Sequence, residues 1–464
     1  MELRDVDGGR LVASGRAPHP PAAPPRSEQD PAAWWAAFEA AYAQAGAPAI
    51  DAVAVAGQQH GMVVLDGRER VLRPAKLWND TESAPQASAL VERLGAGEWA
   101  AACGSVPVAA FTVTKLAWLR ENEPAVFAAV RRVLLPHDWL TLRLTAEEVV
   151  TDRGDASGTG YWSPVDECWR PDLLALVDGD VDWVGRLPRV ADPGEIVGNW
   201  KGARVAPGTG DNMAAALGLG LAPGDVAISL GTSGTVFSVR ERPVADASGA
   251  VAGFADATGR FLPLVCTLNA TRVIDTFARV LGVDLAGFDR LAREAPAGAG
   301  GLVLLPYLDG ERTPNRPDAT GVLAGLRADV TPAQVARAAV EGVVCGLLDG
   351  LDALARADVH VGGGRLALVG GGARSAAVRT IVASLAGRPV TVPAADELVA
   401  TGACVQAASA LQGCPAEQVA AAWSLGRGDV VEPDARVDAA EARGRYAERR
   451  DAEGPSRVGE SGEG

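Results

Sequence analysis

Two short glycine-rich segments carry the residue types that phosphoryl transfer requires. Residues 208–212 read Gly-Thr-Gly-Asp-Asn, and they place the carboxylate of Asp211 on an open turn that a substrate hydroxyl can approach. Residues 229–234 read Ser-Leu-Gly-Thr-Ser-Gly, between the β-like runs 226–228 and 235–239. Glycines let successive backbone N–H groups converge on one anion, and the hydroxyls add donors, so this loop suits a phosphate. A base for a hydroxyl together with a cradle for a phosphate predicts phosphoryl transfer.

A third glycine segment indicates a nucleotide contact. Residues 366–369, Leu-Ala-Leu-Val, predict a buried strand, and Gly-Gly-Gly-Ala-Arg-Ser at 370–375 leads into a predicted helix at 376–382. Such a turn lets a nucleotide lie against the backbone near a helix N-terminus. The segment has neither GxGxxG spacing nor the GxxxxGK[ST] pattern, so a Rossmann site and a P-loop are excluded. A tight structural connection between strand and helix is the alternative interpretation.

In this order and spacing, the three segments resemble the FGGY family of carbohydrate kinases, within the actin/Hsp70/sugar-kinase superfamily. The resemblance runs from near residue 1 to about 448, and within the family it is strongest to kinases of D-xylulose. The stretches that carry it, besides the three segments, are 26–31 before Trp34 and Trp35, 56–61 (Ala-Gly-Gln-Gln-His-Gly), 77–80 (Leu-Trp-Asn-Asp), 134–140 and 305–314. It implies an α/β fold of two ribonuclease H-like (actin-like ATPase) domains, with an ATP and sugar cleft between them.

The resemblance also implies a reaction: transfer of the γ-phosphoryl group of ATP, with Mg²⁺, to the 5-hydroxyl of D-xylulose, in xylose catabolism. Ribulose, gluconate or glycerol as acceptor is the nearest alternative, because related kinases share much of this skeleton. A catalytically impaired sugar- or nucleotide-binding protein is the alternative from a different class. An actin-like or chaperone-like role is disfavoured, because it gives no purpose to the segments 58–61 and 78–80.

Carried over residue by residue, the resemblance gives Asp211 the role of base for the sugar hydroxyl. From its sequence context alone, an Asx-turn or capping role for Asp211 is equally good. The implied sugar contacts are Gln59, His60, Trp78, Asp80, Asp211 and Asn212, and the stretch 155–159 borders them. A core tryptophan and a surface aspartate are the alternative interpretation of Trp78 and Asp80. Many members carry Met-His where this chain has Gln59-His60, so the exact sugar preference stays open.

The resemblance places the nucleotide on the second and third glycine segments. Contacts to the β- and γ-phosphates fall on Gly231, Thr232 and Ser233, and contacts to the adenosine part fall on Gly371, Gly372 and Arg374. Mg²⁺ takes oxygen ligands and usually keeps several waters. Asp211 is the visible candidate to hold it, through water.

The beginning of the chain departs from the family pattern. Members begin with a strand, a first phosphate loop of Asp-x-Gly-Thr-Ser type and a second strand, and the Asp of that loop helps hold Mg²⁺. Here residues 1–6 resemble the end of the second strand, 7–9 a turn and 10–13 the next strand. We therefore expect either a longer product that begins upstream or a catalytically impaired relative.

Composition sets the remaining bounds. With 464 residues, a net charge of −15 and a pI near 4.9, the chain has room for two or three domains and lacks the charge of a nucleic-acid-binding or membrane-surface protein. No signal-peptide pattern and no apolar run of about 18 residues occurs. The six cysteines have no CxxC or zinc-type spacing, which predicts free thiols in a reducing cytoplasm.

Strand and helix patterns alternate in both halves, with strands at 53–56 and 62–65 and helices near 335–354 and 401–411. We expect an N-terminal sugar-binding domain at 1–222, a C-terminal nucleotide-binding domain at 223–450 and a disordered polar tail at 451–464. By analogy with the family, a homodimer is possible.

Overall fold

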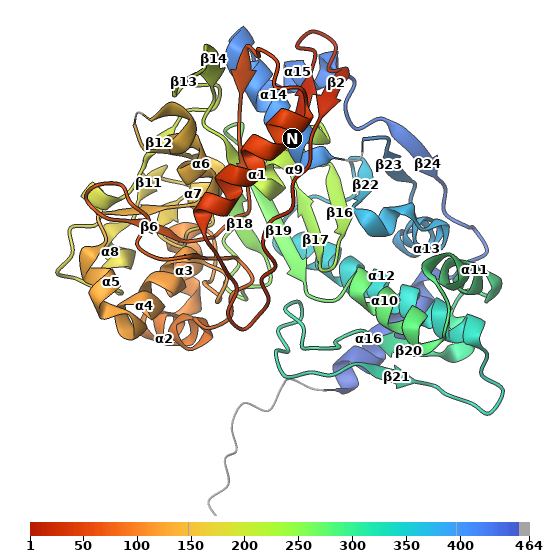
Figure 1. Cartoon of the computed structure of the whole chain (residues 1–464). Helices are drawn as coiled ribbons and strands as arrows, with labels where there is room; N and C mark the ends of the chain where they lie inside the picture. The colour runs from red at the N-terminus through yellow and green to blue at the C-terminus, as the bar shows by residue number, and fades with distance from the viewer. Residues whose placement is uncertain (147, 396, 454–464) are drawn as a thin grey trace, which may run out of the picture. The chain divides into compact units, whose positions relative to one another are not determined.

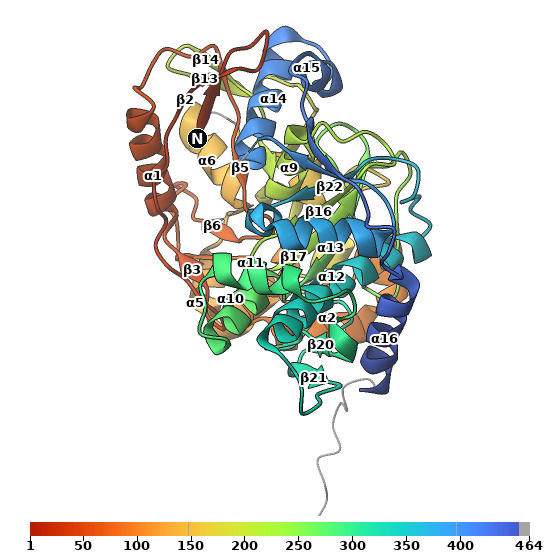
Figure 2. The same ribbon diagram turned by 90° about the vertical axis from the view of Figure 1, so that its right-hand side faces the viewer.

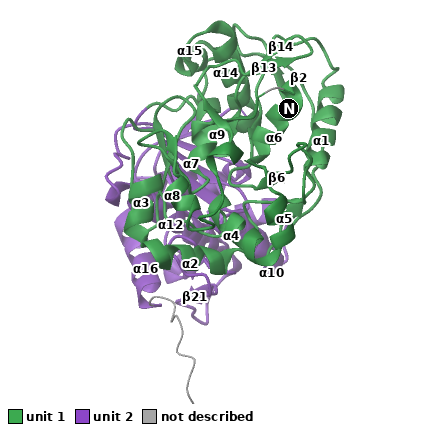
Figure 3. Ribbon diagram, turned by 90° about the vertical axis from the view of Figure 1, so that its left-hand side faces the viewer, with its two compact units in different colours: residues 1–222, 239–263, 397–426 green, residues 223–238, 264–396, 427–464 purple. Residues whose placement is uncertain are grey.

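The computed structural model describes residues 1–146, 148–395 and 397–453 (Figure 1). The chain divides into two compact units, each assembled from separate segments (Figure 3). Unit 1 comprises Met1–Ala222, Val239–Pro263 and Glu397–Gly426; unit 2 comprises Pro223–Ser238, Leu264–Asp396 and Arg427–Gly464. The chain first changes unit at residues 222 and 223, and the segments 239–263 and 397–426 then return to unit 1. A contiguous division into 1–222 and 223–450 lacks these two returns.

Unit 1 alternates short strands with helices. Its elements are β1 (Glu2–Arg4), β2 (Leu11–Ser14), β3 (Glu28–Gln29), α1 (Pro31–Gln44), β4 (Ala52–Val53), β5 (Ala56–Gly57), β6 (Val63–Leu65), β7 (Ala75–Lys76), α2 (Ala84–Leu94), α3 (Ala96–Cys103), α4 (Thr112–Asn122), α5 (Pro124–Ala129), β8 (Arg132–Leu134), α6 (Pro136–Thr145), β9 (Val150–Asp152), α7 (Arg153–Ser157), β10 (Trp162–Ser163), β11 (Cys168–Trp169), α8 (Pro171–Leu174), η1 (Val184–Arg186), β12 (Arg189–Ala191), β13 (Gly198–Trp200), β14 (Ala203–Val205), β15 (Thr209–Gly210), α9 (Asp211–Gly218), β18 (Ala252–Ala255), α14 (Leu398–Gln412) and α15 (Ala416–Ala422). The predicted strands and turn at the start are confirmed: β1 and β2 form an antiparallel hairpin, with Glu2 opposite Ser14.

The elements of unit 2 are β16 (Val226–Leu230), β17 (Gly234–Ser238), α10 (Thr271–Val280), α11 (Leu285–Glu294), η2 (Ala299–Gly301), β20 (Val303–Leu305), β21 (Val322–Ala324), α12 (Pro332–Arg356), β22 (Leu366–Val369), η3 (Gly371–Arg374), α13 (Ala376–Ala386), β23 (Val390–Pro393), β24 (Gly428–Val431) and α16 (Ala439–Ala452). β19 (Phe261–Thr267) begins in unit 1 and ends in unit 2. Of the predicted tail, residues 454–464 lie outside the described part of the chain, and α16 continues to Ala452, so its first two residues are helical.

A twisted sheet forms the centre of unit 2, with neighbouring strands in the order β19, β17, β16, β22, β23, β24. β16 and β17 form the predicted antiparallel hairpin, and β22 pairs with β16 in parallel. The side chains of β22 are all buried, and those of β16 are buried except for Ser229, because helices such as α12 and α13 pack against the sheet. This burial explains why the sequences of β16 and β22 are almost continuously apolar.

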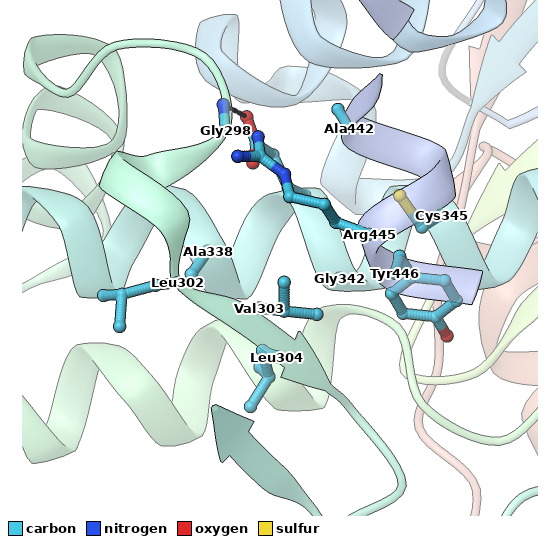
Figure 4. A pocket seen from close by; sticks show the side chains of 11 residues that line it. Gly298, Leu302, Val303, Leu304, Ala338, Gly342, Cys345, Ala442, Arg445 and Tyr446 are labelled. Atoms are coloured by element: carbon cyan, nitrogen blue, oxygen red, sulfur yellow. Dashed lines mark hydrogen bonds between the residues drawn. The ribbon is translucent and has the colours of Figure 1, made fainter. Parts of the chain in front are cut away.

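Close packing continues at the edge of unit 2, where β20 lies against α12 and α16 (Figure 4). The backbone N–H of Gly298 donates to Glu341, at 2.9 Å, and Arg445 and Tyr446 line the space beside it. The cavity there is about 10 Å³, which holds at most about one water. It is a packing gap and not a ligand site.

In unit 1, α9 and α14 pack closely along each other. Glycines allow this: a Cβ at Gly402 would fall on the carbonyl oxygen of Ala214, and a Cβ at Gly218 would fall on that of Leu398. The predicted helix at 401–411 therefore exists, and its glycine side faces the helix that begins with Asp211. None of the described helices is both long and apolar enough to cross a membrane.

Candidate active site

The parallel pairing of β5 with β15 brings two predicted site segments together within unit 1. Ala56 is opposite Thr209, and Gly57 is opposite Gly210. Parallel strands end at the same edge, so the turn after β5, at residues 58–61, and the first residues of α9 emerge side by side. Position 210 has no room for a side chain, because a Cβ there would lie 2.7 Å from Cγ of Gln59.

Asp211 is the first residue of α9, and hydrogen bonds fix its carboxylate. Oδ1 accepts from the backbone N–H of Asn212 at 2.9 Å and from Nδ2 of Asn212 at 3.0 Å. Burial raises the pKa of Asp211 to about 6, against the backbone hydrogen bonds from Asn212 and Gln59 that lower it. The group is thus mostly ionised at neutral pH and close enough to its pKa to accept a proton.

Gln59 links the two segments and has an unsatisfied donor. Its Oε1 accepts from Nδ2 of Asn212 at 2.9 Å. Its Nε2 is buried and has no hydrogen-bond partner among the described residues. A buried amide donor without a partner costs free energy, so its place beside Asp211 indicates a polar ligand there. The structure thus brings Gln59, Asp211 and Asn212 together.

His60 lies in the same turn, with a left-handed φ of 65°. Its Nδ1 is 2.6 Å from the carbonyl oxygen of Gly158, which can only accept, so Nδ1 carries a hydrogen. The ring stacks on Phe111 at 4.8 Å. The predicted border stretch 155–159 therefore contacts this turn through Gly158.

Trp78 and Asp80 differ in their surroundings. Trp78 is 38% exposed, so it is not a core tryptophan. Asp80 is fully buried, and Lys76 Nζ lies 3.1 Å from each of its carboxylate oxygens. It also accepts from the backbone N–H groups of Ser27 and Glu82. These bonds occupy the carboxylate, so the geometry favours Asp80 as a group that positions the turn of Trp78.

The only carboxylate cluster in the described residues with the spacing of a metal site contains Asp80. It consists of Glu28, Asp80 and Glu82. The ammonium of Lys76 lies among these carboxylates, 3.3 Å from Glu28 and 3.8 Å from the ring centroid of Trp118. The ammonium of Lys76 pairs with all three carboxylates and Arg73 pairs with Glu28 as well, so the protein's own cations occupy the place of a divalent metal ion.

A buried network of hydrogen bonds, which the sequence analysis did not identify, holds the residues that precede Asp211. Thr209 donates to Oδ2 of Asp152 at 2.7 Å, and Gln406 of α14 donates to the carbonyl oxygen of Gly208 at 2.9 Å. His137 lies 3.9 Å from Asp152, and its Nδ1 is 2.7 Å from Oδ2 of Asp155. The stretch 134–140 contains His137, but its partners become visible only in the fold.

The second glycine segment is the tip of the β16–β17 hairpin in unit 2. The backbone N–H of Gly231 donates to the carbonyl oxygen of Ser233 at 3.0 Å, which closes the tip. The carbonyl oxygen of Gly231 accepts from the backbone N–H of Thr271, the first residue of α10, and that of Thr232 accepts from the backbone N–H of Ala270. Thr232 is exposed, and its hydroxyl and that of Ser233 form no hydrogen bond with a described residue. The tip is thus a fixed loop with available hydroxyls.

The third glycine segment lies beside this tip, because Ser229 pairs with Val369 at the end of β22. Gly370 has a φ of 86°, and a Cβ there would clash with the carbonyl group of Leu230. Gly371 and Arg374 are exposed, whereas Gly372 is buried against Leu230. Unit 2 therefore presents two glycine turns at one edge of its sheet, the arrangement predicted for a nucleotide.

Comparison with known proteins assigns both halves of the chain to one family. Residues 5–218 match the N-terminal domain of the FGGY family of carbohydrate kinases, and residues 226–411 match its C-terminal domain. A xylulose kinase of Streptomyces coelicolor is 49% identical over 94% of this chain and 90% of its own length. A xylulose kinase of Streptomyces rubiginosus is 50% identical over 92% of this chain and 89% of its own length.

Solved structures give the same result. The crystal structure of xylulose kinase from Bifidobacterium adolescentis has a TM-score of 0.85 with 41% identity, covering 97% of this chain and 96% of that one. The fold, the ordered motifs and these matches together show that the chain belongs to the FGGY family of carbohydrate kinases.

Proposed function

We propose that this chain transfers the γ-phosphoryl group of ATP to the 5-hydroxyl of D-xylulose, giving D-xylulose 5-phosphate and ADP. Family membership implies ATP and, usually, a divalent metal. The choice of sugar is supported by the names of the relatives that are about half identical over most of the chain. The single observation that carries the site is the unpartnered amide of Gln59 beside the carboxylate of Asp211.

Asp211 acts as the base in this proposal. Phosphoryl transfer has a largely dissociative transition state, so the base must above all hold the attacking hydroxyl in line and accept its proton late. Asn212 aims the carboxylate through two hydrogen bonds to Oδ1. Gln59 and His60 bind sugar hydroxyls. The exposed side chain of Trp78 lines the sugar site, and Asp80 holds the turn of Trp78 in position.

The nucleotide binds to unit 2 in this proposal. The backbone N–H groups and hydroxyls of Gly231, Thr232 and Ser233 contact the β- and γ-phosphates, where donors stabilise the charge that develops during transfer. The turn of Gly371, Gly372 and Arg374 holds the adenosine part. Mg²⁺ would neutralise phosphate charge, and the ionised carboxylate of Asp211 fits a ligand that acts through water.

The proposal extends to the cellular setting and the assembly of the protein. The six cysteines are all free thiols, and five of them are buried or half-buried (Cys103, Cys266, Cys345, Cys404 and Cys414). Unpaired cysteines fit a reducing compartment, so we propose the cytoplasm. A homodimer is proposed by analogy with the family alone.

The test is ADP release by the purified chain with MgATP and each of D-xylulose, D-ribulose, gluconate and glycerol. We expect D-xylulose to give the highest kcat/KM, with turnover in the range of about 1–100 s⁻¹. Asp211→Asn keeps the shape but not the base, and it should lower kcat by about 10²–10⁴-fold while the affinity for ATP stays unchanged. Asp7→Asn, at an exposed position, is the control. Full turnover by Asp211→Asn would refute the base assignment, and a preference for another acceptor would refute the sugar.

A further inference from the structure

A second polar depression lies in unit 1, on different elements from the candidate active site. It has a volume of about 420 Å³, within the range of small-molecule sites. Its lining residues are Asp66, Gly67, Glu69, Arg131, Arg132, Asp182, Gly185 and Arg186. The turn at 58–61 precedes β6 and Asp66 follows it, so the depression is at the opposite end of this strand from Gln59 and His60.

Backbone carbonyl groups hold the three arginines of this depression in place. Arg131 donates through Nη1 to the carbonyl oxygens of Ala128 and Val130, at 2.9 and 2.8 Å. Arg186 donates through Nη1 to the same oxygen of Val130, at 2.8 Å. The two guanidinium groups therefore lie no more than two hydrogen-bond lengths apart at these atoms. The third, Arg132, donates to the carbonyl oxygen of Gly185 at 3.2 Å.

The positive charge of these arginines is not neutralised by direct contact. In the described part of the chain, none of the three forms an ion pair with a carboxylate. Asp66 is already engaged, because it pairs with Arg70 at 2.7 Å and accepts from backbone N–H groups. Burial, and after it the charge of Arg131, lowers the pKa of Arg186, whereas the nearby carboxylates of Asp182 and Asp178 act to raise it. Fixed like charges at this distance raise the free energy of the empty site, and a bound anion would lower it.

The shape and chemistry of the lining select among anions. A guanidinium fork matches the oxygens of a phosphate, and two forks held beforehand lose little conformational entropy on binding. Glu69 and Asp182 also line the depression, and carboxylates accept hydrogen bonds from hydroxyl groups. A ligand with a phosphate at one end and hydroxyls at the other satisfies both sets.

We propose that this depression binds a sugar phosphate, with the phosphate on Arg131, Arg132 and Arg186 and the hydroxyls on Glu69 and Asp182. It is a second site, separate from the one at Asp211, and it does not depend on the identity of the sugar that the kinase phosphorylates. Asp66, Glu69 and Asp182 share the lining with the three arginines, so the attraction for the phosphate comes from the local placement of the guanidinium groups and not from a net positive charge of the depression.

The test is calorimetric titration of the full chain with D-ribose 5-phosphate, inorganic phosphate and D-ribose. A non-hydrolysable ATP analogue with Mg²⁺ is kept saturating, so that the loop at Thr232 is filled and cannot bind the probe. We expect D-ribose 5-phosphate to bind more tightly than inorganic phosphate, D-ribose to show no binding, and the affinity to fall with added salt. Equal affinity for D-ribose 5-phosphate and inorganic phosphate would overturn the sugar part of the proposal. Absence of binding by both would overturn all of it.

Variants locate the binding in this depression. Arg131→Gln combined with Arg186→Gln should weaken binding at least tenfold, while kinase turnover stays unchanged because neither residue belongs to the catalytic machinery. Arg68→Gln, in the neighbouring turn but outside the lining, is the matched control. Unchanged affinity in the double variant would refute the site even if the probe binds elsewhere.

A variant with the opposite effect protects the test against simple loss of folding. Asp182→Asn removes a negative charge without removing bulk, and it should strengthen the binding of inorganic phosphate several-fold. It should also reduce the preference for D-ribose 5-phosphate over inorganic phosphate, because a hydroxyl acceptor is weakened. Weaker binding of inorganic phosphate to Asp182→Asn would contradict the proposed placement of the phosphate.

Discussion

The imidazole Nδ1 of His137 lies 2.7 Å from Oδ2 of Asp155, and both side chains are fully buried. Burial alone would lower the pKa of His137, but the carboxylates of Asp138, Asp155 and Asp152 outweigh it and raise the pKa to about 9. The histidine is thus mostly protonated at neutral pH, and burial raises the pKa of Asp138 to about 7 and that of Asp155 to about 6, so the carboxyl groups around it are not all ionised. Because Asp152 in turn accepts from Thr209, this cation helps fix the turn that presents Asp211.

The charge on His137 predicts how stability depends on pH. Its pKa is raised from 6.5 in the unfolded chain to about 9, so its contribution to folding is complete below pH 6.5 and is lost as pH rises through about 9. The difference corresponds to about 3 kcal/mol. Urea unfolding of the wild type at pH 6.5, 8 and 9.5 should show this decline.

Two substitutions separate the charge of His137 from its shape. His137→Lys keeps a cation that stays protonated at pH 9, so the decline between pH 7 and 9 should shrink. His137→Gln leaves the carboxylates without their cation and should cost about 3–5 kcal/mol at pH 6.5. A His137→Gln variant as stable as the wild type would show that the carboxylates, and not the histidine, are uncharged.

Gln59 provides a test of the sugar contact. Gln59→Met removes the unpartnered Nε2, and we expect the KM for the sugar to rise about tenfold because one hydrogen bond to a hydroxyl is lost. The KM for ATP should not change. Gln86→Met, which also replaces a buried glutamine but in α2, is the matched control in steady-state kinetics. An unaltered sugar KM in Gln59→Met would remove this residue from the site.

Substitution of Asp80 tests whether this residue positions the turn of Trp78 or binds the sugar directly. Asp80→Asn keeps an acceptor for Ser27 and Glu82 but removes the fully buried one of the three carboxylates that pair with Lys76. Breaking such a buried pair typically costs about 3–5 kcal/mol, so the free energy of unfolding should fall markedly. The sugar KM of the folded fraction should stay within about twofold, since the carboxylate is already occupied. A large rise in KM without loss of stability would instead place Asp80 on the sugar.

The contact between α9 and α14 can be tested with a single methyl group. Gly402→Ala would place a Cβ on the carbonyl oxygen of Ala214, so we expect a large fall in Tm, because backbone cannot move aside cheaply. Gly97→Ala in α3 has open space around it and should stabilise by about 0.5–1 kcal/mol. If both variants had the same Tm, the close helix contact would be wrong.

Local patterns in the sequence were sufficient for part of this structure. The β16–β17 hairpin follows from two apolar runs around a Gly/Thr/Ser loop, whereas the β1–β2 hairpin was expected from comparison with the family pattern. The position of Gln59 beside Asn212 followed only from family resemblance, because 153 residues separate them. Their contact depends on the pairing of two-residue strands, which carry almost no sequence signal.

Other features could not be predicted because they depend on tertiary partners. A surface position is the alternative interpretation that the sequence allows for Asp80. The structure instead buries it, because Lys76 pairs with its carboxylate and the backbone N–H of Ser27 donates to it. The returns of 239–263 and 397–426 to unit 1 follow from packing and not from any linker-like composition. The same is true of Gln406, whose spacing is that of an ordinary helical residue.

The bond from Gln406 to the carbonyl oxygen of Gly208 has a consequence for biosynthesis. α14 follows late in the sequence, and it supplies the last support of a turn that is translated well before it, since Gln406 and Gly208 are 198 positions apart. A nascent chain therefore cannot complete unit 1 until α14 has left the ribosome, although its first 222 residues are already exposed. During that interval the apolar side of α9 has no α14 to pack against and stays exposed to solvent, which favours aggregation.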